Sequence, residues 1–175
     1  GEDKSLLNYH GKPQLLHIKD IVQDYVDEVY FSAPRNKLAS FLDKLKLKED
    51  EFIADAFPFK GPLCGILSAM FSDPKSAWLV VANDLPYRNK NTIEHLVGKR
   101  NPLKNSTYFR SPDIEKSLQL PGPLCAIYEA RFFTRLMAQA GTGGRCPRKA
   151  LLYTGGQALD LLDEKSLLNA NSQND

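Results

Sequence analysis

The sequence predicts one α/β domain in which helices cover both faces of a mostly parallel β-sheet. Amphipathic helical patterns alternate along the chain with short apolar runs, as expected of such a domain. One of these runs, at 78–82, has no polar interruption, which is typical of a strand buried on both faces of a parallel sheet. The length of 175 residues suits one domain with a substantial core.

The first half of the chain is predicted to begin with two helix–strand pairs. Apolar residues recur at three- and four-residue steps over 13–26, and Pro13 fits the first turn of a helix there. The segment 28–33 is typical of a strand and ends at Pro34, which cannot donate to a ladder. In chain order, the predicted elements are helix 13–26, strand 28–33, helix 36–47, strand 52–55 and a helix that begins at Pro62.

The second half continues the alternation. The predicted elements are strand 78–82, helix 91–99, strands 106–110 and 124–128, helices 130–140 and 147–153, and strand 158–162. Between the two middle strands, the polar segment 111–119 and Pro121-Gly122-Pro123 predict a loop. The order of strands and helices favours parallel pairing, and no internal linker divides the sequence into two domains.

Composition argues against several classes of function. The net charge of +2 gives no general affinity for nucleic acid, and the longest apolar runs are far shorter than a membrane span. No basic-then-apolar leader opens the chain, so we expect a cytoplasmic protein with neither nucleic acid nor membrane among its partners. The 3 cysteines form no C-x-x-C pair, which favours reduced thiols over disulfides or a zinc site.

Asp84 is the first candidate for a metal ligand. The apolar run 78–82 is followed by Asn83, Asp84, Leu85 and Pro86, so Asp84 is expected at the carboxyl end of a strand. Ligands bind at that edge of open α/β sheets, and Mg²⁺ takes one or two carboxylates while phosphates and water complete its shell. The alternative is a turn residue that caps the following helix.

Three further residues fit a phosphate or nucleotide site. Lys4 precedes the first helix, where its ammonium could lie beside phosphate oxygens; the alternative is a solvated lysine. Gly61 begins G-P-L-C-G, a loop that enters a helix whose first amides favour anions. Asp55 is predicted at a strand end, where it could accept hydrogen bonds from a base or ribose, unless it is a turn residue.

Two polar groups follow later in the chain. Asn169 and Asn171 alternate in L-L-N-A-N and could complete a metal shell or hold a phosphate, or else belong to a polar tail. Arg145 and Arg148 follow a glycine-rich break near a predicted helix start, which suits a phosphate clamp as well as a solvated basic face. The sequence contains no G-x-S-x-G, H-E-x-x-H or Walker-type segment.

Taken in order, five segments resemble the molybdenum cofactor guanylyltransferase family of MobA-type nucleotidyltransferases. They are G-E-D-K-S-L-L-N-Y-H-G-K-P-Q at 1–14, G-P-L-C-G-I-L-S-A at 61–69, A-N-D-L-P at 82–86, G-P-L-C-A-I-Y at 122–128 and N-A-N-S at 169–172. The resemblance implies a three-layer α/β/α Rossmann-like nucleotidyltransferase fold. It also implies transfer of a nucleoside monophosphate, usually from GTP, to the terminal phosphate of molybdopterin, with release of pyrophosphate in the presence of Mg²⁺.

The resemblance assigns nucleotide-side roles to five positions. Lys4 matches the lysine that contacts the triphosphate, and Asp84 matches the aspartate that binds Mg²⁺. Asp55 falls at the acidic position that helps to recognise guanine, and Ser32 at a nucleotide-contacting position where some members carry Asn. Gly61 begins the glycine-containing segment that is also expected to bind the nucleotide.

On the acceptor side, Asn169 and Asn171 match an N-x-N motif, and Arg145 and Arg148 fall in a segment expected to face the pterin phosphate. The implied partners are GTP and the molybdopterin cofactor, with transient contact to molybdoenzymes or cofactor-insertion proteins. The implied mechanism is in-line attack of the acceptor phosphate on the α-phosphorus, assisted by positioning and charge neutralisation.

One family segment is expected ahead of this sequence. The family motif L-A-G-G-x-S-x-R-M, with its strand and glycine-rich loop, would lie just before Gly1, and the sequence printed here does not include it. We therefore expect residues 1–175 to form a single nucleotidyltransferase domain whose N-terminal strand and loop are missing.

Two alternatives stay open at this point. The first is a cytidylyltransferase of the same fold that uses CTP; Asp55 favours guanine, because a carboxylate accepts from both the ring N–H and the amino group of that base. The second is a protein that binds nucleotide or cofactor without turnover. The missing loop favours this second reading, whereas Lys4, Asp84 and the asparagine pair favour an enzyme.

Overall fold

The computed structural model describes residues 11–83, 90–113 and 118–161. Its helices are α1 (Gln14–Val22), α2 (Leu38–Leu45), α3 (Pro62–Ser72), α4 (Lys90–Gly98), α5 (Phe133–Gly141) and α6 (Pro147–Thr154). Short 3₁₀ turns are η2 (Gln23–Tyr25), η3 (Arg35–Lys37), η4 (Glu49–Glu51) and η5 (Ala130–Phe132). The strands are β1 (Phe31–Ala33), β2 (Phe52–Ala54), β3 (Trp78–Val81), β4 (Ser106–Asp113), β5 (Leu118–Tyr128) and β6 (Gln157–Leu159).

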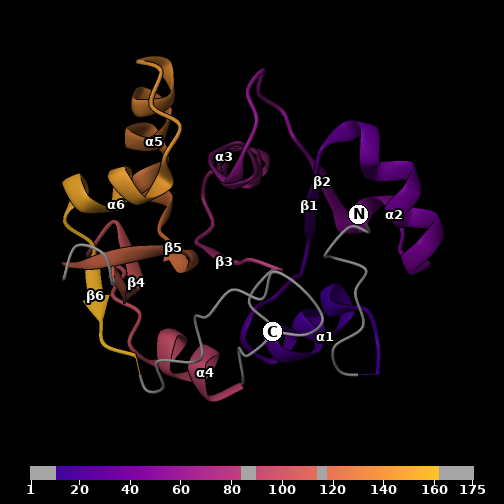
Figure 1. The fold of residues 1–175 in the computed structure, drawn as a ribbon, viewed down its shortest axis with the longest axis horizontal. Coiled ribbons are helices and arrows are strands. Elements are labelled where there is room, and N and C mark those ends of the chain that lie inside the picture. The colour runs from indigo at the N-terminus through magenta and orange to yellow at the C-terminus, as the bar shows by residue number, and fades with distance from the viewer. Residues whose placement is uncertain (1–10, 84–89, 114–117, 162–175) are drawn as a thin grey trace.

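The molecule has three layers, as the sequence predicts. In Figure 1, α3, α5 and α6 lie above the strands, and α1 and α4 lie below them. The predicted helices are confirmed within a few residues of their ends, whereas strands β1 and β6 are shorter than predicted. The α/β class is therefore confirmed, and the helices occupy both faces of the strand layer.

The strands form two separate sheets among the described residues. β1 and β2 pair in parallel, with Phe31 opposite Phe52 and Ala33 opposite Ala54. The other sheet has the order β3-β5-β4-β6; β5 runs antiparallel to both of its neighbours, and β4 and β6 are parallel. The second sheet is thus mixed, and the expectation of a mostly parallel arrangement holds only for the β1–β2 and β4–β6 pairs.

Strand β3 corrects one detail of the sequence prediction. It pairs antiparallel with β5 and is only half-buried, although a fully buried parallel strand was expected. Its apolar run has another cause: Trp78 and Val80 pack against one core, and Leu79 and Val81 against the other. Consecutive side chains of a strand point to opposite faces, so apolar cover on both faces produces an unbroken apolar run whatever the strand direction.

Most of the segment predicted as a loop before residue 124 belongs instead to two paired strands, since residues 111–113 lie in β4 and residues 118–123 in β5. Pro121, Gly122 and Pro123 lie within β5. The pairing jumps there: Tyr108 lies opposite Ala126, and Arg110 lies opposite Pro121. A strand tolerates proline where the ladder is interrupted, because the missing N–H then leaves no hydrogen bond unmade.

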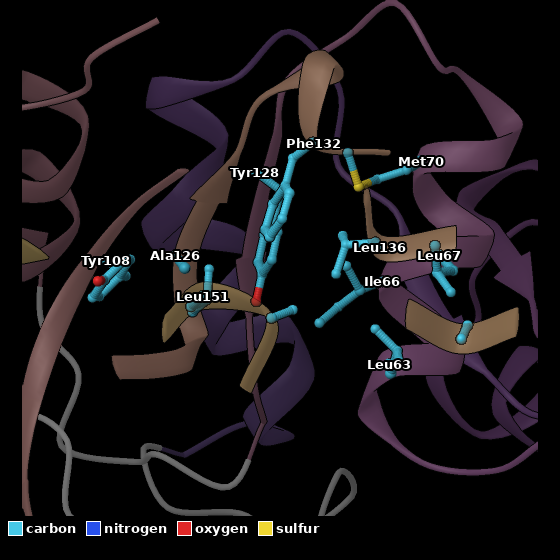
Figure 2. Packing of buried hydrophobic residues seen from close by; sticks show 12 residues of the cluster. Leu63, Ile66, Leu67, Met70, Tyr108, Ala126, Tyr128, Phe132, Leu136 and Leu151 are labelled. Carbon is cyan, nitrogen blue, oxygen red and sulfur yellow. The ribbon is translucent and has the colours of Figure 1, made fainter. Parts of the chain in front are cut away.

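Two cores lie on the two sides of the strands. The first core, between β4–β5 and the helices α3, α5 and α6, contains Leu63, Ile66, Leu67, Met70, Tyr108, Ala126, Tyr128, Phe132, Leu136, Ala140, Ala150 and Leu151. Figure 2 shows Tyr128 and Phe132 side by side in its middle. Their rings stack with centroids 5.9 Å apart, and the Tyr128 hydroxyl donates to the Pro123 carbonyl at 2.7 Å. Complete burial raises the pKa of Tyr128.

The second core lies between the strands and the helices α1 and α4. It contains Ile18, Val22, Ile93, Leu96, Phe109, Cys125 and Ile127. Beside both cores, the half-exposed Arg100 donates Nε and Nη2 to the Glu129 carboxylate at 2.8 and 2.9 Å, and Glu129 is only 5% exposed. This bidentate pair links the end of α4 to the end of β5.

Candidate functional site

A cavity of about 1130 Å³ lies between β1 and β3, with α1 along one face and α3 along the other. We call it the β1–β3 groove. The sequence-predicted residues Ser32, Asp55 and Gly61 all line it, together with Gly65 and Asn83. These three residues therefore line one cavity, and their role in binding a nucleotide stays a prediction.

Parallel pairing brings Ser32 and Asp55 to the same edge of the small sheet. Ala33 lies opposite Ala54, and the Asp55 N–H donates to the Ala33 carbonyl at 3.2 Å. Each polar residue therefore lies near the carboxyl end of its strand. This is the edge at which ligands bind in open α/β sheets.

Two glycines bring helix α3 close to that edge. Gly61 is the residue before α3 and has φ +102°, a conformation that side-chain-bearing residues rarely adopt. Pro62 follows in the first turn. One turn on, a Cβ atom at Gly65 would lie 2.7 Å from Ser32 Oγ. Gly65 therefore allows the Ser32 hydroxyl to lie against the helix backbone.

The loop 55–61 is fastened to α3 by hydrogen bonds. The Ala56 N–H donates to Ser68 Oγ at 2.8 Å, and the Cys64 thiol donates to the Phe57 carbonyl at 3.6 Å. Burial raises the pKa of the Cys64 thiol, and the nearby Asp55 carboxylate raises it further. Cys64 therefore stays protonated near neutral pH and is no nucleophile, so its role here is packing.

The far side of this loop contacts the segment that carries Arg145. The Arg145 guanidinium lies over the Phe59 ring, 4.3 Å from its centroid, and Nη1 donates to the carbonyls of Ala140 and Gly144 at 2.6 and 3.1 Å. Neither Arg145 nor the exposed Arg148 lines the β1–β3 groove. The two arginines thus lie apart from Ser32, Asp55 and Gly61, and Arg145 already holds two carbonyls and a ring.

The charges on the groove wall are mostly acidic or already paired. Lys19 donates to Glu51 at 2.6 Å, and Arg100 is held by Glu129. The hydrogen bond from Lys19 lowers the pKa of Glu51, and the Lys48 backbone N–H lowers it further. The lining carboxylates are Asp27, Glu28, Asp55 and Asp73. Among the described residues that line the groove, each cation that could contact a polyphosphate is therefore already in an ion pair.

Four of the predicted site residues, Lys4, Asp84, Asn169 and Asn171, lie outside the described residues. The groove does reach Asn83, the last described residue before Asp84. Over residues 11–83, 90–113 and 118–161, no group of three or more His, Cys, Asp or Glu side chains is placed to hold a metal ion. Over the same ranges, no helix combines the length and the apolar character needed to cross a membrane.

Sequence reasoning gave no role to Gly65 or Phe59. Gly65 was visible as the second glycine of G-P-L-C-G, but its close contact is with Ser32 of β1, which is distant in the sequence. Phe59 precedes Gly61 by two residues, and its contact with Arg145 joins segments far apart in the chain. Neither contact has a signal in local spacing.

Residues 1–158 match the MobA-like NTP transferase domain. The chain belongs to this family. The match covers most of the 175 residues, including β1 and β3 with the groove between them.

Named relatives agree with this assignment. The chain is 28% identical over 176 residues to the molybdenum cofactor guanylyltransferase of Pseudomonas entomophila, covering 98% of this chain and 86% of that protein. It is 29% identical to a molybdenum cofactor biosynthesis bifunctional protein of Synechocystis, all of the chain matching 48% of that protein. The chain thus spans about half of this longer relative.

Solved structures show the same fold. Molybdopterin-guanine dinucleotide biosynthesis protein A from Archaeoglobus fulgidus superposes with a TM-score of 0.75 and 21% identity, over 99% of this chain and 87% of that one. A 4-diphosphocytidyl-2C-methyl-D-erythritol synthase gives a TM-score of 0.72 at 11% identity, over 99% and 91% of the two chains. At these identities the likeness establishes the nucleotidyltransferase-like α/β fold.

Proposed function

We propose that this MobA-like nucleotidyltransferase transfers GMP from GTP to the molybdopterin cofactor and releases pyrophosphate. The observation that carries the proposal is the convergence of Ser32, Asp55 and Gly61 in one groove of a chain of this family. The printed names of the Pseudomonas and Archaeoglobus relatives support guanine as the base and molybdopterin as the acceptor.

Asp55 is proposed to select the base. It is half-buried beside the entry to α3, so its carboxylate can accept from the ring N–H and the amino group of guanine. Ser32 lies on the adjacent strand and is held against Gly65. The first turn of α3 opens onto the groove at Gly61 and Pro62, and its helix dipole favours the negative charge of a nucleotide.

The chemistry requires no protein nucleophile. An oxygen of the acceptor phosphate attacks the α-phosphorus, the bond from the α-phosphorus to the bridging oxygen breaks, and pyrophosphate leaves with that oxygen. The protein contributes positioning and charge neutralisation. Because the cations lining the groove are paired, Lys4 is the proposed partner of the triphosphate.

Mg²⁺ is the proposed cofactor, and Asp84 is its proposed ligand. Mg²⁺ usually binds through one or two carboxylates plus substrate phosphates, so a ready-made group of three acidic or imidazole ligands is not required. When bound, Mg²⁺ would neutralise charge on the reacting phosphates.

Pyrophosphate release tests the proposal directly. The complete polypeptide encoded by the gene, incubated with GTP, Mg²⁺ and molybdopterin, should release pyrophosphate and form the guanine dinucleotide, with CTP a poor substitute. A preference for CTP would identify a cytidylyltransferase, and binding without turnover would identify a carrier protein. Either result contradicts the proposal.

Variants separate the proposed roles. Asp84→Ala should lower the rate by about 10²–10³-fold, whereas Asp43→Asn, at an exposed carboxylate on α2, serves as the control. Lys4→Ala should weaken GTP binding. Asp55→Asn should weaken GTP binding by about 1.5–3 kcal/mol and reduce discrimination against ITP, which lacks the amino group. Unchanged GTP-to-ITP selectivity would remove Asp55 from base recognition.

The acceptor side is proposed to include Asn169, Asn171 and Arg148. Arg148 is exposed in the first turn of α6, so its guanidinium is accessible to a phosphate. Arg148→Gln should raise the KM for molybdopterin while the KM for GTP stays unchanged. Arg145 is a proposed member of the same segment, but its substitution would also disturb Phe59 and should therefore affect both substrates.

A further inference from the structure

Three exposed apolar side chains lie on the side of the molecule away from the β1–β3 groove. Leu103 is 79% exposed, Leu152 48% and Tyr153 82%. In Figure 1, the helices α5 and α6 lie on the left, whereas β1 and β2 lie on the right. The described lining of the groove includes none of the three side chains. A large molecule that covered them would therefore leave the groove open.

Hydrogen bonds bring the segments that carry these side chains to one corner. Arg131 Nη1, in the turn before α5, donates to the Leu103 carbonyl at 3.1 Å. The Thr154 carbonyl, at the end of α6, accepts from Arg135 Nη1 at 3.5 Å and from the Asn105 side chain. The loop before β4, the start of α5 and the end of α6 therefore form one continuous surface.

The loop that exposes the leucine is itself fastened to the fold. Asn101 Oδ1 accepts from the Leu103 N–H at 3.1 Å, and Asn101 Nδ2 donates to Gln157 Oε1 at 2.9 Å. Two residues after the leucine, the Asn105 carbonyl accepts from the Glu129 N–H at 3.0 Å. A loop held in this way loses little conformational entropy when a partner covers it, so its apolar surface is preorganised for binding.

The charge around these side chains has one sign. Residues 95–112 and 130–159 contain no Asp or Glu, although the whole chain has a net charge of only +2. The exposed cations at the corner are Lys104, Arg131 and Arg135. In the part of the chain that the structure describes, none of these three cations is in an ion pair. They are therefore available to anionic groups of another molecule.

The two arginines are suited to carboxylates. Arg131 and Arg135 each have one nitrogen on a backbone carbonyl, which holds the guanidinium in place and leaves its other N–H donors for a ligand. Positive charge beside apolar side chains fits a partner that presents carboxylates beside apolar groups. We call this surface the basic corner; it consists of Leu103, Lys104, Arg131, Arg135, Leu152 and Tyr153.

The apolar part of the basic corner favours a protein over a nucleic acid. Single-stranded nucleic acids bind by stacking bases on several aromatic rings, and the basic corner has one ring, that of Tyr153. Tyrosine and arginine beside buried apolar groups are typical of protein interfaces. A second copy of this chain would place like charges opposite each other, which opposes association through this surface.

We propose that the basic corner binds an acidic segment of another protein. The Asp and Glu side chains of that segment pair with the three cations, and its apolar side chains cover the three exposed apolar residues. Because the basic corner lies apart from the β1–β3 groove, the partner can bind while the groove is occupied. The proposal does not depend on the substrates of the enzyme.

Selection of peptides tests this proposal. Short random peptides displayed on phage and selected on the protein should converge on sequences that combine Asp or Glu with apolar residues. By fluorescence anisotropy, the synthetic consensus peptide should bind at least about 10-fold more weakly to Tyr153→Ala and to the double variant Arg131→Glu/Arg135→Glu. Lys44→Glu/Lys75→Glu makes the same change in net charge at two exposed lysines elsewhere, and it should change the Kd by less than about 2-fold.

Every other outcome contradicts the proposal. Failure of the peptides to converge, a consensus without carboxylates, or binding that the variants of the basic corner leave unchanged would overturn it. An equal loss in the double lysine variant would show that net charge alone explains binding. Tighter binding of an oligouridylate that carries the same charge as the peptide would assign the surface to nucleic acid. A dimer that the double arginine variant dissociates would assign it to a second copy.

Discussion

The β1–β3 groove and the first core differ in how their residues are held. In the groove, Ser32 is exposed on a strand of three residues, and Asp55 is half-buried just beyond another. In the first core, Tyr128 and Phe132 are both 0% exposed and stack on each other. Folding stability is therefore expected to come from the core, while the groove supplies polar groups at little cost in stability.

The largest expected effect is a change in the first core. Phe132→Ala removes a fully buried ring and should lower the free energy of unfolding by about 3–5 kcal/mol. Ser32→Ala, in the groove, should change it by less than about 0.5 kcal/mol. Urea unfolding of both variants measures the contrast, and equal losses would abolish the distinction between the two regions.

Next comes the ion pair that joins α4 to β5. Glu129→Gln leaves Arg100 without its carboxylate and should cost about 1–3 kcal/mol, since Glu129 is buried while the Arg100 side chain is 41% exposed. Asp160→Asn is the matched control: Asp160 is 79% exposed and pairs with Arg110. It should cost at most about 0.5 kcal/mol, so a similar loss in both unfolding curves would contradict this account.

A smaller effect is expected inside the groove. Gly65→Ala places a methyl group 2.7 Å from Ser32 Oγ, so the serine side chain must turn away. We expect GTP to bind about 10-fold more weakly, or about 1.4 kcal/mol, with little change in unfolding. Calorimetric titration measures this, and adding Ser32→Gly should restore part of the affinity if the contact is the cause.

The smallest effect is a pH dependence at the edge of the groove. The pKa of Glu51 is lowered mainly by Lys19, so the pair stabilises the fold above the unfolded value of about 4.3 and this contribution is lost as the pH falls through the folded pKa. Glu51→Gln should therefore cost about 0.5 kcal/mol at pH 7 and nothing near pH 2. A difference that persists in acid would exclude the ion pair as its cause.

Local patterns were sufficient for the helices and for part of the site. The apolar periodicity of 13–26 predicts α1 directly, because a helix that packs against a core needs a stripe of apolar side chains along one face. Ser32 was assigned only through the family resemblance, whereas Asp55 and Gly61 were predicted from a strand end and from the start of a helix, which meet at one edge of an α/β unit. These inferences use only neighbours in the chain.

Strand direction and long-range contacts could not be predicted in this way. The apolar run of β3 arises because each face of the strand packs against a hydrophobic core. Parallel and antiparallel strands can both be buried in this way, so the run does not reveal the strand direction. The prolines at 121 and 123 predicted a loop. They fit within β5 because its pairing with β4 is interrupted beside them, and the sequence of β5 alone does not show that interruption. The place of Arg145 against Phe59 likewise depends on a packing that brings α5 to the loop 55–61.

Strand β3 has a consequence for the uniqueness of the fold. Trp78 and Val80 belong to one core, and Leu79 and Val81 to the other. Sliding this strand by a single residue would exchange every side chain between the two cores, forcing an indole into space shaped for leucine. It would also take the Trp78 indole N–H from the Asp73 carbonyl, which it reaches at 3.1 Å. A misaligned form of the domain would therefore lose both the core packing of β3 and the hydrogen bond of the Trp78 indole.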